Sequence, residues 1–153
     1  MNFQSALPCL LLCGTLQAQV AERDPRGGGA LKIGGTSYRF RPTSLFRAPD
    51  KGSLGGAIRL EGTLTAKEAP RPFHLALTLL KDGSLYMLRI ERKAPGAYPE
   101  SWAATRGTRI LTKNPGARHG GRMEVQCEGP LTGIIAQRPQ EAAWSGTLWV
   151  VFS

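Results

Sequence analysis

The chain has 153 residues, of which 41% are hydrophobic and 20% charged; these values are typical of one globular domain and argue against a disordered chain. Its 20 Lys and Arg outnumber its 11 Asp and Glu, which gives a formal net charge of +9. Such a surface attracts anions, either an anionic polymer or an anionic membrane surface, although charge also serves solubility. The basic residues form no long run, so they indicate no specific nucleic-acid motif, and the oligomeric state stays open.

Residues 1–18 resemble a secretory signal peptide. The segment 6–16 is mostly apolar, no charged side chain precedes Glu22, and Ala18 supplies the small residue that a cleavage site favours. The apolar segment is shorter than the roughly 20 residues that cross a bilayer as a helix. We therefore expect a cleaved leader and an exported protein, periplasmic or extracellular.

Cleavage after Ala18 would leave a glycine-rich segment, 19–29, that we expect to be a flexible linker before a single antiparallel β domain at 30–153. Cys13 lies in a sequence that loosely resembles a bacterial lipoprotein acceptor. The bulky Leu12 before it departs from the small residue that this pattern requires. Lipoprotein anchoring in a bacterial envelope through Cys13 is therefore the less favoured alternative.

The most informative stretch is 73–92, where two apolar-rich runs flank Asp82-Gly83. Asp-Gly is a strong signal for a two-residue type I′ turn, because both residues tolerate positive φ. The turn fixes the register of the two strands, so we expect a β-hairpin with one buried face and one wetter face. The predicted pairs are Lys81–Ser84, Leu79–Tyr86, Leu77–Leu88, Leu75–Ile90 and His74–Glu91, the last as an ordinary surface hydrogen bond.

Short strands are also predicted before this hairpin. Segments 31–33 and 38–41 form a small hairpin around a Gly-rich loop, and 57–65 alternates as a half-exposed strand. Between them, 42–56 is rich in Pro, Gly and Ser, so we expect a long loop, and long loops in compact domains are often functional.

After the hairpin, Pro99 can open one helical turn that carries Trp102, which we expect in the core. Four strands then follow, and the nearly continuous apolar residues of the last one predict a strand covered on both sides. Eight or nine short strands without a long helix predict an all-β fold: a single-domain antiparallel β-sandwich or a small closed barrel of about eight strands. The four C-terminal strands are expected at 108–113, 122–128, 131–137 and 143–152, with a loop at 114–121.

Motifs for catalysis, metals or cofactors are missing: the chain has no phosphate loop, no paired Cys spacing for zinc and no nucleophile elbow. We therefore predict no cofactor, no metal and no catalytic residue. Cys127 shares a strand face with Met123 and Val125, which favours a buried structural thiol over a nucleophile. His119 lies among Gly and Arg and is expected to be a solvated loop residue.

One group of residues suggests ligand binding. The aromatic and Arg residues alternate from Tyr38 to Arg47, and Arg can bind phosphate, sulfate or carboxylate groups while rings stack on bases or sugars. The same alternation also arises in any strand with one buried face. We predict an anion-binding surface formed by Arg39, Arg41, Arg47, Arg118 and Arg122.

Three functions follow as hypotheses. The favoured one is an exported β-sandwich that acts as a binding or interaction module for an anionic envelope component or polymer. The first alternative is an enzyme whose site is assembled from distant loops with Cys127 or His119. The second alternative is a small outer-membrane β-barrel, which is weakened by the few aromatic residues and by strands shorter than about 9 residues.

Overall fold

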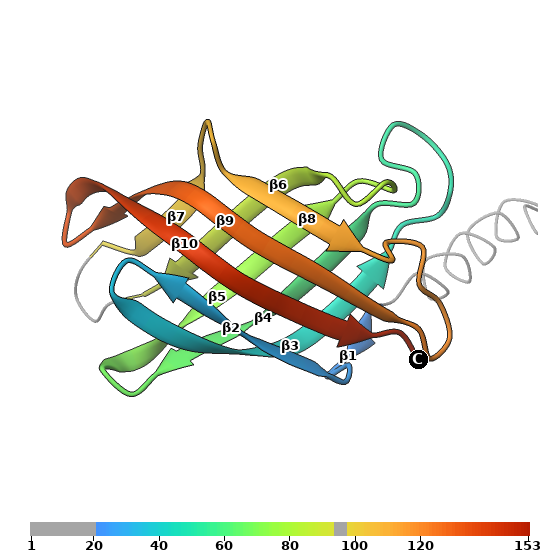
Figure 1. Cartoon of the computed structure of the whole chain (residues 1–153), viewed down its shortest axis with the longest axis horizontal. Coiled ribbons are helices and arrows are strands. Elements are labelled where there is room, and N and C mark those ends of the chain that lie inside the picture. The colour runs from blue at the N-terminus through green and yellow to red at the C-terminus, as the bar shows by residue number, and fades with distance from the viewer. Residues whose placement is uncertain (1–20, 94–97) are drawn as a thin grey trace, which may run out of the picture.

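The computed structural model describes residues 21–93 and 98–153, which form one antiparallel sheet closed into a barrel (Figure 1). Around the barrel the strand order is β3-β2-β10-β9-β7-β6-β5-β4, and β4 pairs with β3 to close it. Two extra strands lie on this eight-stranded barrel: β1 pairs with β3 and β8 pairs with β9. The all-β class is therefore confirmed, and the architecture is the closed barrel. The strands are β1 Glu22–Arg23, β2 Gly27–Ile33, β3 Thr36–Arg47, β4 Ile58–Ala66, β5 Ala69–Leu79, β6 Leu85–Arg92, β7 Glu100–Ala104, β8 Arg109–Lys113, β9 Arg122–Ile135 and β10 Arg138–Val151.

The barrel closes because apolar and polar residues alternate along its strands. In β4, for example, Ile58, Leu60 and Leu64 are fully buried, whereas Arg59 and Thr65 are exposed. Successive side chains of a strand point to opposite faces, so most apolar side chains of the barrel strands meet inside the barrel. Burial of these side chains supplies the main driving force for folding.

The central hairpin has the predicted register over most of its length, but its turn differs. From His74–Glu91 to Thr78–Met87 the pairs match the prediction, and then the register shifts so that Leu79 lies opposite Leu85. The amide of Leu80 donates to Ser84 O at 2.8 Å, which leaves a three-residue loop, and Gly83 has a φ of 88°. A bulge at Tyr86 compensates for the longer loop. Asp-Gly serves both turn types, so the sequence pattern did not distinguish them.

Two segments that were expected to be irregular belong to strands. β2 begins at Gly27, inside the range expected to be a linker. Glycine at 27 and 29 allows β2 to lie close to β10, because a Cβ at either position would collide with the backbone of β10. β3 continues to Arg47, through Pro42, and the loop 42–56 is correspondingly shorter. Pro42 is tolerated because the register with β4 shifts between Pro42 and Ser44, and proline in sheets is found at such bulges.

The C-terminal half differs in two ways from the expectation. The segment after Pro99 is strand β7 and not a helical turn, because Trp102 pairs with both Ile90 and Gly133. Residues 122–151 form a single long hairpin, β9–β10, in place of three shorter strands. Its turn lies at Ala136 and Gln137, which have φ values of 52° and 64°.

Each of the three tryptophans faces a glycine on a neighbouring strand. Trp102 pairs with Gly133, Trp144 with Gly129 and Trp149 with Gly28. Trp102 and Trp144 are buried in the core, 7% and 1% exposed. A glycine leaves room for the large ring on the neighbouring strand, and in this way the barrel accommodates its bulkiest side chains.

The predicted signal peptide and the lipoprotein alternative at Cys13 lie outside the described residues. In the described part of the chain, no helix has the length and apolar character needed to span a membrane.

Candidate functional site

The inside of the barrel offers no groups that would orient a ligand. The inward side chains are hydrophobic and tightly buried, and among the described residues no polar or charged residue is buried. Ligand sites combine an apolar surface with a few well-placed polar groups. The candidate site therefore has to be sought on the outer surface of the barrel.

The outer surface over β9, β10, β2 and β3 is ordered in rows by the strand register. Trp149 lies between Glu124 of β9 and Gly28 of β2. Thr147 of β10 and Arg39 of β3 both pair with Ala30, and Trp149 and Arg41 lie two residues from them on their own strands. Residues opposite each other in an antiparallel pair project on the same side. Trp149 and Arg41 therefore share the outer face.

A second row lies beside the first. Val151 pairs with Arg122, and its amide donates to the backbone oxygen of Arg26 at 2.8 Å. Arg26 and Arg122 are both exposed, on either side of Val151. We call the surface made by these two rows and by Arg39, which lies two residues before Arg41 on β3, the arginine–tryptophan face; it consists of Arg26, Arg39, Arg41, Arg122 and Trp149.

Trp149 lies at the centre of this face and is held from two sides. The guanidinium carbon of Arg122 is 4.2 Å from the centre of its ring, a cation–π contact. On the β2 side, a Cβ at Gly28 would lie 3.4 Å from Nε1 of the indole, so the ring rests against the glycine backbone. Arg122 also pairs with Glu124 at 2.9 Å. The indole is thus oriented before any ligand arrives.

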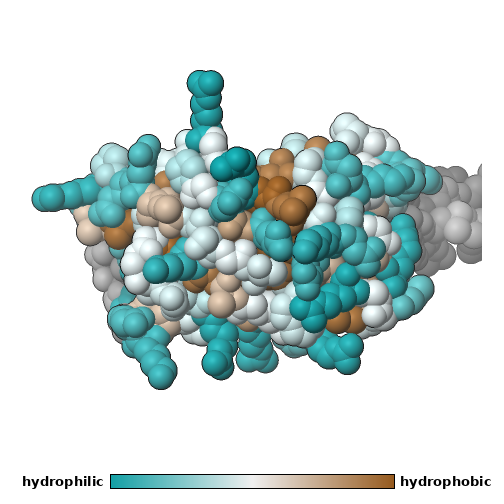
Figure 2. All heavy atoms as spheres, viewed as in Figure 1, coloured by the Kyte–Doolittle hydropathy of each residue, from teal (hydrophilic) through white to brown (hydrophobic). Residues whose placement is uncertain are grey.

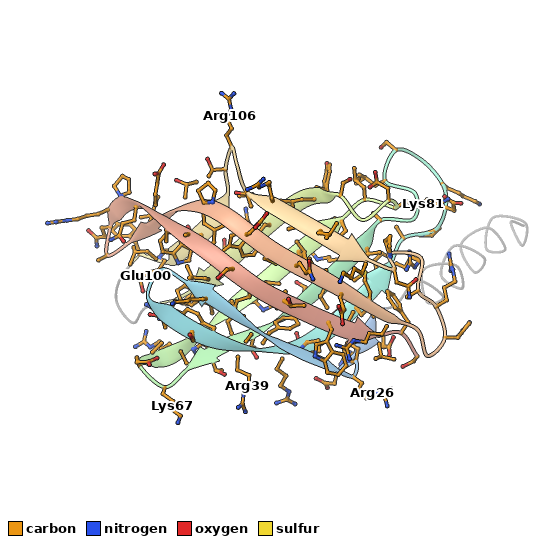
Figure 3. The ribbon with its side chains drawn as sticks, in the orientation of Figure 1. Arg26, Arg39, Lys67, Lys81, Glu100 and Arg106 are labelled. Atoms are coloured by element: carbon orange, nitrogen blue, oxygen red, sulfur yellow. The ribbon has the colours of Figure 1, made fainter. Side chains whose placement is uncertain are left out.

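The other arginines of the face have no carboxylate partner. Among the described residues, Arg26, Arg39 and Arg41 take part in no ion pair within 4.0 Å, and all three are exposed. Figure 3 shows Arg26 and Arg39 projecting from the same side of the barrel, together with Lys67 of the β4–β5 turn. Arg39 and Lys67 also line a shallow hollow of about 630 Å³. Their charges are available to an anion.

Arg47 has a structural role at one end of the barrel. Its guanidinium donates to Pro115 O at 2.8 Å and to Ala117 O at 2.9 Å, and it lies 4.9 Å from the centre of the Phe152 ring. Burial lowers the pKa of Arg47 below its ordinary value, and the positive charge of Arg118 adds to this effect. Arg47 therefore fastens the loop 114–121 to β3, and Arg118 of that loop lies near it.

The structure thus divides the five predicted arginines into two groups. Arg39, Arg41 and Arg122 share the arginine–tryptophan face, whereas Arg47 and Arg118 line a separate hollow at the barrel end. The sequence pattern did not single out Trp149, because the apolar run of β10 suggested a strand covered on both sides. Trp149 is in fact partly exposed, and a period of two from the buried Leu148 and Val150 indicates its outward position. Arg26 was missed because it lay in the expected linker.

Cys127 is a buried core residue, as its strand pattern predicted. It is 4% exposed, and its Sγ donates a hydrogen bond to Val125 O at 3.9 Å. Burial raises the pKa of the Cys127 thiol to about 12. At neutral pH the thiol is therefore protonated and shielded, whereas a nucleophilic cysteine needs a thiolate.

The raised pKa of Cys127 predicts a loss of stability in alkali. The unfolded thiol titrates near 9 and the folded one near 12, so the folded state keeps its proton as pH rises. The stabilisation is complete below pH 9 and is lost between pH 9 and 12, at up to about 1.4 kcal/mol per pH unit. The measurement is the free energy of unfolding in denaturant from pH 8 to 10.5, in a chain with Cys9 and Cys13 replaced by Ser. Cys127→Ala should remove this part of the slope; an unchanged slope would contradict the assignment.

Both histidines lie on the exposed surface of the protein. His119 is exposed in its loop, with Nδ1 3.2 Å from Ser153 O. His74 is opposite Glu91 as predicted, but its Nε2 lies 3.3 Å from Oε1 of Glu61 on β4, so the predicted hydrogen-bond partner was wrong. Among residues 21–93 and 98–153, no three His, Cys, Asp or Glu side chains gather where they could hold a metal ion.

The fold and the site define a small closed β-barrel with a filled core and a basic, aromatic outer face. Comparisons of the chain with protein-family models, with curated proteins and with solved structures found no match.

Proposed function

We propose that this chain is an exported binding module that holds an anionic polymer against the outer wall of its barrel. The observation that carries the proposal is the arginine–tryptophan face, where Arg26, Arg39 and Arg41 have no carboxylate partner among the described residues and share the outer surface with Trp149, whose ring Arg122 contacts. Guanidinium groups bind sulfate, phosphate or carboxylate oxygens, and an indole ring stacks on sugars or bases.

The dimensions of the face favour an extended ligand over a small one. Arg122 on β9 and Arg41 on β3 are separated by three strand spacings, which amounts to about 14 Å. Arg39 and Arg41 are two residues apart on β3, which extends the face by about 7 Å along that strand. A chain with repeated negative groups can contact several of these positions at once.

The remaining hypotheses have less support. Cys127 is buried with a raised pKa, and its Sγ donates to the backbone oxygen of Val125, whereas a cysteine nucleophile needs a partner base. The outward positions of β3 carry Arg39 and Arg41, whereas the outer face of a membrane barrel is an apolar band. Both observations favour the binding module.

Replacing Arg39 and Arg41 by Ser should weaken binding to heparin, the probe for an anionic polymer, and should flatten its salt dependence. Binding then releases fewer counterions, so each lost contact should reduce the slope of log affinity against log salt concentration by roughly 0.7 to 0.9. Affinity is measured at several salt concentrations, with single-stranded DNA and anionic lipid vesicles as further arms. Arg47 is left intact in this variant, because its loss would disturb the loop 114–121.

A matched control is the double variant Arg106→Ser with Arg138→Ser, which lowers the net charge by the same amount as the Arg39/Arg41 variant. Figure 3 shows Arg106 on the opposite side of the barrel from Arg39. Trp149→Ala should lower the affinity 5- to 100-fold by removing a stacked ring, with a nearly unchanged salt slope. Equal losses of heparin affinity in the Arg39/Arg41 and Arg106/Arg138 variants would show that binding depends only on the net charge. That result would refute a defined binding face.

A further inference from the structure

The barrel wall has a gap between β6 and β8. β7 and β8 follow one another along β9: Ser101–Ala104 pair with its second half and Arg109–Lys113 with its first half. β6 pairs with β7 only through Arg89–Arg92. Beside β8, the residues 85–88 of β6 have no partner strand on that side, and almost all Cα distances between β6 and β8 exceed 8 Å. Paired strands have Cα atoms about 4.5 to 5.5 Å apart.

This gap, which we call the seam, is bounded at both ends and has an apolar floor. At one end Thr112 Oγ1 donates to Gly83 O at 2.6 Å, and at the other end Arg89 pairs with Ala103. Leu85 and Ile110 are partly buried and pack against the core. The seam therefore exposes the unpaired edge of β8 without opening the interior of the barrel.

Large apolar side chains are exposed on both of the strands that border the seam. Leu111 of β8 is 58% exposed, and Tyr86 and Met87 of β6 are 54% and 45% exposed. The bulge in the central hairpin turns both Tyr86 and Met87 outward, where strict alternation would bury one of them. Figure 2 shows apolar atoms gathered over the part of this face where Figure 1 draws β8. Contiguous exposed apolar groups commonly mark interaction sites.

The charges on β8 disfavour a second copy of the chain as the occupant. Arg109 and Lys113 flank Leu111 on the outward side of the strand. In an antiparallel pair of two β8 strands centred on Leu111, each Arg109 would lie opposite the partner's Lys113, and like charges directly opposite destabilise such a pair.

The same charges favour an acidic strand. Lys113 is in no ion pair within the described part of the chain, and Arg109 is 3.5 Å from Glu128 with both side chains largely exposed. An extended segment with carboxylates opposite Arg109 and Lys113 and an apolar residue opposite Leu111 would match all three outward positions. Its backbone would bond to the unpaired edge, as in other cases of strand addition.

We propose that the edge of β8 binds an extended acidic segment of a partner protein, with the alternation acidic–apolar–acidic on its outward side. The residues involved are separate from the arginine–tryptophan face, so this interaction does not depend on the proposed polymer binding.

The probe is a synthetic peptide that contains Glu-Val-Leu-Val-Glu between threonines, and its control carries Lys in place of both Glu. We expect the Glu peptide to bind the full chain at least tenfold more tightly than the Lys peptide, measured by calorimetry. Hydrogen exchange of the amides in 109–113 should slow when the Glu peptide is bound, because they gain hydrogen bonds.

The charge-reversed variant Arg109→Glu with Lys113→Glu should prefer the Lys peptide. Both side chains are exposed, so we expect this variant to fold, which circular dichroism checks. Leu111→Asp should weaken binding of the Glu peptide, whereas the Arg39/Arg41 variant should bind it normally. Equal binding of both peptides, protection outside 109–113, or a dimer of the chain that protects 109–113 without peptide would each overturn the proposal.

Discussion

Trp144→Ala should lower the free energy of unfolding by about 3 to 5 kcal/mol, a large part of the stability of a domain of this size. The Trp144 side chain is 1% exposed, and its Nε1 donates to Glu128 O at 2.9 Å. The substitution leaves a cavity in the barrel and removes the donor for that oxygen. Urea unfolding should show a lower midpoint with an unchanged slope, as expected for a loss of stability alone.

Trp149→Ala is the matched control, because it deletes the same side chain from the outer face of the same strand. Its cost should be about 1 kcal/mol, mainly the cation–π contact with Arg122. If Trp144→Ala does not fold, Trp144→Phe gives a smaller loss that can be measured and should still exceed that of Trp149→Phe. Equal losses at the two positions would contradict the inward and outward assignment of β10.

Gly133→Ala should be strongly disruptive for a change of one methyl group, with a loss of about 3 kcal/mol. A Cβ at Gly133 would lie 2.2 Å from Ser101 O and 2.6 Å from Cε3 of Trp102, so either the backbone or the buried indole must move. The thermal midpoint measures the effect, and a shift of several degrees is expected.

Gly35→Ala is the control for this change, since a Cβ there would meet no atom within 4 Å. It should leave the stability unchanged or raise it by up to about 1 kcal/mol, because alanine restricts the unfolded chain. A tolerated methyl at Gly133 would show that β7 and β9 are not as close as described.

Local patterns were sufficient to predict the all-β class and most of the central hairpin. Alternation over several residues fixes which face of a strand is buried, and for this reason the pairs from His74–Glu91 to Thr78–Met87 were predicted correctly. The turn was wrong because Asp-Gly fits two loop lengths. The segments around Gly27 and Pro42 were misassigned because their strand conformation depends on distant partners, β10 and β4.

The candidate site was only partly predictable for the same physical reason. Arg39 and Arg41 could be placed on an outward face from their own strand, whereas the fixed role of Arg47 depends on oxygens of residues 115 and 117, which sequence spacing does not reveal. Trp149 became part of the candidate site only through the register of three strands, which sets it between Glu124 of β9 and Gly28 of β2. A pattern along one strand carries no information on its neighbours.

The tryptophan–glycine pairs also bear on how such a barrel can diversify by descent. At Gly133 a side chain collides with the backbone, and at Gly129 the φ of 101° itself requires glycine, so these inner positions are closed to change. At Gly28 an added Cβ would meet only the Trp149 ring, at ordinary contact distances of 3.4 Å and more. Descendants of this sequence can therefore exchange the outer pair while they inherit the inner pairs unaltered.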